Sequence, residues 1–138
     1  MRISKKSQYG LRAMVYLAGV FGEEKKICSL REISEKEDIS FDYLEKIMSK
    51  LEKKGLVSSK RGVRGGYFLK RSPQKISVGE VIRILENTMS PVKCLAKEKR
   101  YNCPRKRTCK TLNVWKKVHE VLSSTLNSIT LADLVKKK

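Results

Sequence analysis

The sequence is poor in acidic residues, with 14 Asp and Glu against 32 Lys and Arg, which leaves a formal net charge of +18. It has one histidine, and aromatic residues make up only 7% of the chain. It shows no nucleophile–base constellation and no glycine-rich phosphate loop after a strand, so we expect no enzyme and no catalytic residues. The few aromatics disfavour base stacking on RNA. The positive excess favours a polyanionic partner.

Long hydrophobic runs are also missing. No apolar segment approaches the roughly 20 residues that span a bilayer, and the N-terminus lacks the apolar region and cleavage site of a signal peptide. We therefore expect a cytoplasmic protein without a membrane partner. In a reducing compartment, four cysteines favour metal ligands or redox-active thiols over structural disulfides.

Residues 39–69 are predicted to form a helix followed by a basic hairpin. The apolar residues of the helix recur at intervals of three and four: Leu44, Ile47, Met48 and Leu51. Ser40 stands at the N-cap position, and Gly55 stands where the helix ends. Residues 56–61 and 67–69 are predicted strands around a glycine-rich turn that needs positive φ. This is the layout of a winged helix.

Further helices are predicted from apolar spacing and from capping patterns, over residues 5–21, 29–38, 78–86 and 112–129, with a last short helix from Thr130. Only a few residues separate the second helix from the one that begins at Ser40, so this pair forms a helix-turn-helix. The fold class that follows is mainly α with a small β-hairpin. It consists of a winged helix-turn-helix domain and a long C-terminal helix.

The helix predicted over residues 112–129 is amphipathic. Its apolar stripe consists of Leu112, Trp115, Val118, Leu122, Leu126 and Ile129. Because the domain behind it is small, we expect the stripe to meet a second copy of itself and to form a homodimer. The predicted organisation is a winged helix-turn-helix domain over 1–90, a cysteine-containing loop over 91–110, and a dimerisation helix with a C-terminal helix over 111–138.

The predicted helix and hairpin suit DNA. An α-helix fits the major groove, and the hairpin places Lys60, Arg61 and Arg64 where a neighbouring backbone or minor groove would lie. A helix and hairpin packed into any small domain, with solvated charges, would produce the same pattern. The hairpin alone therefore does not decide between the two interpretations.

Cys94, Cys103 and Cys109 lie in the loop with the spacing C-x8-C-x5-C. Loop thiolates can converge on iron or zinc, although the spacing lacks the paired CxxC of zinc ribbons. The surrounding bases are Lys93, Lys97, Lys99, Arg100, Arg105, Lys106, Arg107 and Lys110. Their field lowers thiol pKa values and favours a bound anion, either a thiolate-held cluster or phosphate. Three exposed thiols in a flexible loop are the alternative.

Several segments resemble the winged-helix regulator family that includes IscR, NsrR and CymR, the Rrf2 family. They are MRISKKSQYGLRAM at 1–14, DYLE at 42–45, GLVSS at 55–59, RGVRGGY at 61–67 and VGEVI at 78–82. The resemblance runs in order along nearly the whole chain. It implies a homodimeric transcription factor that binds a palindromic operator in double-stranded DNA, with the third helix in the major groove and the wing beside it.

By position, Ser40, Asp42, Tyr43 and Glu45 match the family's recognition-helix residues, and Arg61 matches a wing arginine that approaches the minor groove. With Lys46 and Arg64, the candidate DNA-binding set is Ser40, Asp42, Tyr43, Glu45, Lys46, Arg61 and Arg64. Glu45 could accept a hydrogen bond from a cytosine amine. A solvated helix residue is the alternative interpretation of Glu45.

In the cluster-binding branch of the family, three cysteines before the long helix ligate an iron–sulfur cluster, and Cys94, Cys103 and Cys109 match them. The resemblance implies a repressor or sensor modulated by that cluster, 2Fe–2S or 4Fe–4S undetermined. Two departures stand out. The first gap is longer than the family's usual one, and the usual fourth ligand is missing, since Leu112 replaces a histidine and Gln8 a carboxylate.

Cys28 and His119 are the other residues of this chain that could complete the ligand set, but both are expected mainly as packing residues. The fourth ligand is left open. The alternatives to a cluster-bound regulator are a metal-free or zinc-bound thiol switch and a basic RNA-binding module.

Overall fold

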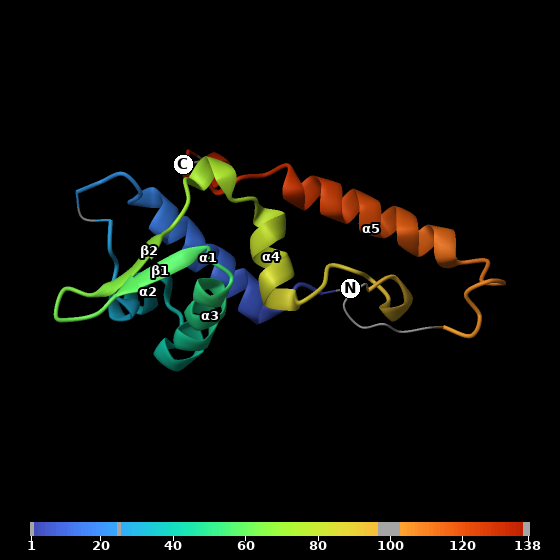
Figure 1. The fold of residues 1–138 in the computed structure, drawn as a ribbon, viewed down its shortest axis with the longest axis horizontal. Coiled ribbons are helices and arrows are strands. Elements are labelled where there is room, and N and C mark those ends of the chain that lie inside the picture. Colours follow the sequence, from blue (N-terminus) through green and yellow to red (C-terminus); the bar gives the residue numbers. More distant parts are fainter. Residues whose placement is uncertain (1, 25, 97–102, 137–138) are drawn as a thin grey trace.

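The structure is a computed structural model that describes residues 2–24, 26–96 and 103–136 (Figure 1). Its elements, in order, are α1 (Lys5–Gly19), α2 (Leu30–Glu37), α3 (Phe41–Lys53), β1 (Val57–Lys60), β2 (Gly66–Leu69), η1 (Pro73–Lys75), α4 (Val78–Glu86), η2 (Lys93–Leu95), α5 (Leu112–Asn127) and α6 (Leu131–Val135). The predicted fold class, a mainly helical winged helix-turn-helix with a small hairpin and a long C-terminal helix, is confirmed.

Most helices begin at a serine or threonine that caps the first turn. The hydroxyls of Ser4, Ser29, Ser40, Ser77 and Thr130 each accept a hydrogen bond from the backbone N–H three residues further on. Such a cap stabilises a helix by about 1 kcal/mol, because it satisfies one of the unpaired N–H groups of the first turn. In α5 the N-cap residue, Thr111, makes no such bond.

Among the helices of the described ranges, the reciprocal half of the capping box forms only at Thr130, where the Asp133 carboxylate accepts a hydrogen bond from the Thr130 N–H. In α2 the carboxylate of Glu32 instead accepts a hydrogen bond from the hydroxyl of Tyr16 at 2.6 Å. In α4 the carboxylate of Glu80 pairs with the Arg71 guanidinium at 2.6 Å. The carboxylates of Glu32 and Glu80, which the sequence pattern assigned to capping, therefore bind residues outside their own helices.

The core lies between α1, α3 and α4 and is closed by α2, β1 and α6. The predicted stripe of α3 is buried as expected, with Leu44, Met48 and Leu51 at 0% exposure. Leu131 of α6 belongs to the same core. Helices α1 and α4 approach closely at Gly10, where a Cβ atom would lie 2.2 Å from Leu85 Cδ1.

The wing is the antiparallel pair β1–β2, in register from Val57 opposite Leu69 to Lys60 opposite Gly66. Cys28 extends this pair through an isolated bridge to Tyr67, with N–O distances of 2.9 and 2.8 Å. A Cβ atom on Gly66 would lie 2.2 Å from the Cys28 carbonyl oxygen. Glycine is therefore needed where the wing crosses the segment before α2.

Helix α5 projects away from the rest of the molecule (Figure 1), and only its C-terminal end packs against α4. At Gly79 a Cβ atom would collide with the side chain of Asn127, and Arg83 Nη1 donates to Asn127 Oδ1 at 2.6 Å. No residue of α5 is fully buried. Within the described ranges, no helix is long and apolar enough to cross a membrane.

Candidate nucleic-acid interface and cysteine loop

The predicted recognition residues share the outward side of the helix-turn-helix. Ser40, Asp42, Tyr43, Glu45 and Lys46 are all exposed. Asp38, in the left-handed conformation at φ 53°, ends α2, and two hydrogen bonds between residues 34 and 39 close the turn. The stripe of α3 must face the core, so its polar residues face outward. The geometry needed to enter a groove is present.

Two neighbouring elements hold α3 on opposite flanks. On one flank, the Tyr43 ring packs edge-on against the Tyr9 ring of α1, with centroids 5.7 Å apart. On the other flank, the Ser59 hydroxyl of β1 donates to Glu52 Oε2 at 2.6 Å. The helix is therefore fixed between α1 and the wing, and its exposed face has a defined orientation.

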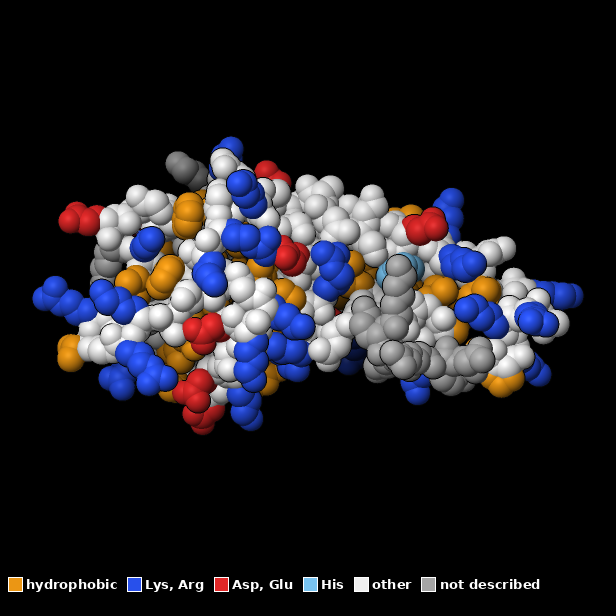
Figure 2. Space-filling model, in the orientation of Figure 1, with side chains coloured by type: hydrophobic (Ala, Val, Ile, Leu, Met, Phe, Trp, Pro, Cys, Tyr) orange, Lys and Arg blue, Asp and Glu red, His pale blue; other side chains and the backbone are white. Residues whose placement is uncertain are grey.

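The wing arginines, Arg61 and Arg64, are exposed on either side of the turn, and the fully exposed Val63 lies between them. The salt bridges found in the described part of the chain, Arg12–Glu37 and Arg71–Glu80, involve neither wing arginine. Figure 2 shows basic side chains over the hairpin and beside α3, with several acidic side chains gathered at α3 itself. The wing therefore supplies the positive charge that suits a duplex, while α3 presents groups of both signs.

The three loop cysteines lie between α4 and α5: Cys94 in η2, and Cys103 and Cys109 on the segment before α5. All three are partly exposed, and none is in a disulfide. Cys28 is buried at 2% exposure under the wing, as expected of a core residue. The structure therefore separates Cys28 from the loop set.

Cys109 is the loop thiol with a distinct electrostatic environment. Its sulfur lies 3.4 Å from Thr111 Oγ1, just before the start of α5. Hydrogen bonding by the Thr111 side chain and N–H, and by the Leu112 N–H, lowers the pKa of the Cys109 thiol, and Arg105 lowers it further. The thiolate is the form that binds metal. The Thr111 hydroxyl, which makes no capping bond to α5, instead lies within hydrogen-bonding distance of the Cys109 sulfur.

The donor chemistry of this loop fits a thiolate-held metal group. In the described residues, however, no three His, Cys, Asp or Glu side chains are grouped closely enough to hold a metal ion. The predicted bases Lys97, Lys99 and Arg100 lie outside the described residues. The structure therefore does not gather Cys94, Cys103 and Cys109 into one site.

The other residues considered as ligands, Gln8 and His119, differ in their surroundings. The Gln8 amide donates to the Ile3 carbonyl at 2.9 Å. His119 is partly buried, and within the described residues its Nδ1 has no hydrogen-bond partner. It lines a cavity of about 240 Å³ together with Leu95, the neighbour of Cys94, and with Ser123 and Asn127. His119 is thus near one end of the cysteine loop.

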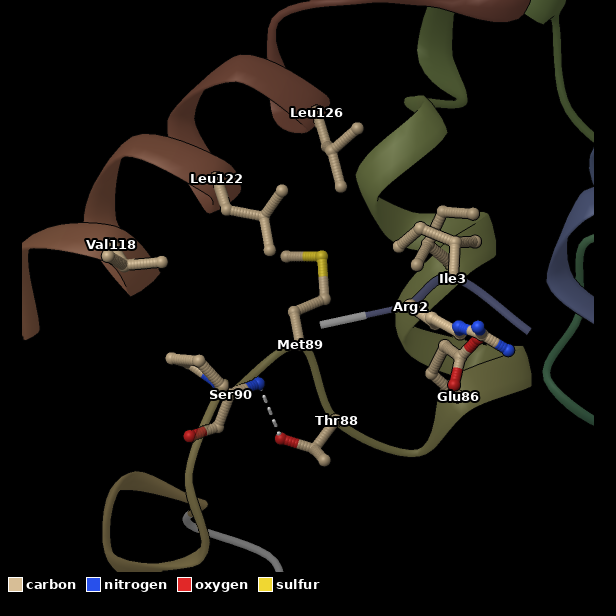
Figure 3. Close-up of a pocket in the computed structure, with 11 residues that line it drawn as sticks. Arg2, Ile3, Glu86, Thr88, Met89, Ser90, Val118, Leu122 and Leu126 are labelled. Carbon is tan, nitrogen blue, oxygen red and sulfur yellow. Dashed lines mark hydrogen bonds between the residues drawn. The ribbon is translucent and has the colours of Figure 1, made fainter. Parts of the chain in front are cut away.

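The predicted dimer stripe of α5 faces partly toward its own chain. Val118, Leu122 and Leu126 line a hollow of about 430 Å³ that is closed by α4, the N-terminus and residues 88–91 (Figure 3). The apolar residues that α5 leaves most exposed include Val114 and Val121, outside the predicted stripe. The apolar spacing selected the stripe, and several residues of that stripe line this hollow within the same chain. Val114 and Val121 lie outside the spacing, so it did not select them.

Comparison with known proteins identifies relatives that are transcriptional regulators. Residues 3–137 match the Rrf2 family model, described as iron-dependent transcriptional regulators. The chain is 38% identical over 135 residues to the HTH-type transcriptional regulator IscR of Yersinia pseudotuberculosis serotype O:1b (strain IP 31758), covering 98% of this chain and 79% of that protein. IscR of Serratia proteamaculans (strain 568) has the same identity and coverage.

Solved structures agree. CymR, the global cysteine regulator of B. subtilis, superposes with a TM-score of 0.79 at 37% identity, covering 100% of this chain and 98% of that one. IscR of T. potens superposes with a TM-score of 0.76 at 38% identity, covering 99% and 87%. The helix-turn-helix, the wing and the sequence similarity together establish that this chain belongs to the Rrf2 family of winged-helix, DNA-binding transcriptional regulators.

Proposed function

We propose that this regulator acts as a homodimer on a palindromic operator, and that an iron–sulfur cluster held by its loop cysteines modulates DNA binding. The observation that carries the proposal is that one chain presents an exposed α3 face beside a basic wing and, on the segment that leads to its unburied helix α5, a set of partly exposed thiols. We place it in the cytoplasm, where its DNA partner is found.

The reading face works through α3 and the wing. Ser40, Asp42, Tyr43, Glu45 and Lys46 approach the major groove, where the Glu45 carboxylate accepts a hydrogen bond from a cytosine N4 amine. Arg61 and Arg64 follow the adjacent minor groove, whose negative potential attracts guanidinium groups. Tyr9 of α1 and Ser59 of β1 hold α3 in place, so little ordering is required on binding.

Cys94, Cys103 and Cys109 would hold the cluster, with Cys109 already favoured as the thiolate by its surroundings. The cluster, when bound, supplies sensitivity to oxidants or to small ligands of iron. The loop leads into α5, so its closure around the cluster would set the position of α5. In a dimer, the position of α5 would set the distance between the two winged-helix domains that contact DNA.

Self-association is assigned to α5. Its exposed apolar residues Val114, Trp115 and Val121 find no cover in the described part of their own chain, and a second copy related by two-fold symmetry would cover them. Two heads then meet half-sites about one helical turn apart, which is the geometry of a palindrome.

Anaerobic purification followed by absorption spectroscopy tests the cluster. We expect visible charge-transfer bands and bound iron in the native protein, and loss of both in Cys103→Ala. The matched control is Cys28→Ala, which removes a thiol outside the loop and should retain the bands. A colourless native protein that contains zinc, or no metal, would instead support the thiol-switch alternative.

Selection from a random duplex library tests the reading face. We expect recovery of a palindromic sequence and, for Glu45→Gln, relaxed preference at one base pair in each half-site by about 1–3 kcal/mol. Asp133→Asn, on α6, is the control and should leave the selected sequence unchanged. Equal affinity of the native protein for selected and random duplexes, in oxidised and reduced forms, would contradict the proposal.

A further inference from the structure

The C-terminal end of α4 joins the start of α1 to the recognition helix. The Glu86 carboxylate accepts hydrogen bonds from the Ser4 N–H and the Ser7 hydroxyl, both at 2.8 Å. The next residue, Asn87, accepts a hydrogen bond from Lys50 Nζ of α3 at 2.9 Å. These contacts bring the first turn of α1 beside the second half of α3.

Lysines gather at this junction. Lys54 follows Lys50 by four residues and therefore lies one turn further along the same side of the chain as it leaves α3. Lys6 stands next to Ser7 on the first turn of α1. Burial lowers the pKa of Lys50, and the positive charges of Lys6 and Lys54 lower it further, so each of these two lysines acts on the Lys50 ammonium group.

One acidic group, Glu86, offsets part of the charge of this lysine cluster, defined as Lys6, Lys50 and Lys54: it raises the pKa of Lys50, and Lys6 lowers the pKa of Glu86. The hydrogen bonds from Ser4 and Ser7 favour the ionised carboxylate, so three positive charges face one negative charge and the junction keeps a positive excess. The salt bridges seen in the described ranges involve none of the three lysines. Holding like charges together weakens the folded state. A bound anion would reverse that cost.

The lysine cluster has a fixed place relative to the reading face. A helix completes a turn in about 3.6 residues, so Lys50 lies on the same flank of α3 as Tyr43, the flank that faces α1. Glu52, nine residues after Tyr43, lies on the opposite flank, against the wing. The wing and the lysine cluster thus stand on the two sides of the helix that would enter the major groove.

We propose that Lys6, Lys50 and Lys54 form a phosphate-binding site that grips the DNA backbone on the side of α3 opposite the wing. The inference rests on the proposed DNA-binding function and adds a second anchor to it. One edge of the groove is held by the wing and the other by the lysine cluster, so α3 is prevented from rolling in the groove. Phosphate contacts of this kind position a protein without reading sequence.

The test is the salt dependence of binding by the full-length protein. The triple variant K6Q/K50Q/K54Q is compared with a control variant, K70Q/K75Q/K136Q, which removes the same charge from exposed lysines on other elements. Each phosphate contact contributes about 0.9 to the slope of log affinity against log salt, so we expect the slope to fall by about 2–3 in the triple variant. The control should lose less than about 1.

Two further readouts separate a phosphate site from a structural role. The selected operator and a random duplex should weaken by the same factor, because phosphates carry no sequence information. The thermal midpoint of the triple variant should equal or exceed that of the native protein, because like charges have been removed. A slope equal to that of the control overturns this inference while leaving the proposed function intact. Loss of duplex binding by the native protein overturns both.

Discussion

The winged-helix head, meaning α1–α4 with the hairpin and α6, and the long helix α5 are built on opposite principles. In the head, side-chain caps begin each of these α-helices, and the stripe of α3 is almost fully buried. In α5, no side chain caps the N-terminus and no residue is fully buried. An isolated helix of this length is marginal in water. The head is therefore stabilised by its own contacts, and the proposed homodimer would add the contacts that α5 lacks.

The largest effect on stability is expected from a matched pair of substitutions by alanine, one in the head and one in α5. Leu51→Ala removes a fully buried side chain of the head and should lower the free energy of unfolding by about 3 kcal/mol, because it leaves a cavity. Val121→Ala removes a side chain of α5 that is 57% exposed and should change it by less than about 0.5 kcal/mol in the monomer. Urea denaturation measures both. Equal losses would contradict the contrast.

A charge placed on α5 tests whether this helix mediates self-association. Val121→Lys should weaken self-association about tenfold to a hundredfold, because a lysine cannot be buried between two apolar faces at no cost. Sedimentation equilibrium measures the change, and Lys117→Gln, an exposed position of the same helix, is the control. Unfolding of the head should be unaffected. An unchanged dissociation constant would remove α5 from the interface.

Within the head, Glu86→Gln tests a polar junction. The hydrogen bonds from Ser4 and Ser7 keep the pKa of Glu86 below its ordinary 4.5, although burial opposes them. A lowered folded-state pKa adds stability that is present above the ordinary value and is lost as pH falls through the folded value. We expect the variant to be about 1 kcal/mol less stable at neutral pH, after allowing for solvent screening.

The same measurement at low pH supplies the check on Glu86. Thermal unfolding of the native protein and of Glu86→Gln should converge as pH falls below the lowered folded-state pKa of Glu86, because both side chains are then neutral. A difference in stability between the two proteins that stays constant over the whole pH range would mean that the loss of stability comes from the changed shape of the side chain, and not from its charge.

The smallest effect is expected at the surface of the head. Arg71→Gln breaks the ion pair with Glu80, whose two side chains are 39% and 31% exposed. Because water and salt screen such a pair, the loss should be less than about 1 kcal/mol and should shrink further in high salt. Thermal unfolding at two salt concentrations measures it, and a loss that is independent of salt would contradict this account.

Local patterns predicted the elements of the head because each was specified by neighbouring residues. The stripe of α3, its cap at Ser40 and the positive φ of Gly55 all follow from chain positions within a few turns. The partners of Glu32 and Glu80 could not be predicted in this way. Their carboxylates bond to Tyr16 and Arg71, which lie outside the helices they were expected to cap.

The candidate site shows the same division. The spacing of Cys94, Cys103 and Cys109 marked the loop from sequence, and burial of Cys28 matched expectation. The hydroxyl of Thr111 directed at Cys109, and the inward orientation of several stripe residues of α5, had no signal in the spacing. The first is a contact between residues two apart in the loop, and the second depends on how α5 is set against α4.

By itself, the sequence determined the order of helices and strands, the exposed face of α3 and the excess of positive charge, because periodicity, caps and composition act over short distances along the chain. Only the tertiary structure decided that Lys6 acts on the pKa of Lys50, that Gly66 must admit the Cys28 carbonyl, and which apolar residues of α5 are left uncovered. These features depend on packing between segments far apart in the chain, and packing is settled by the shape of the whole core.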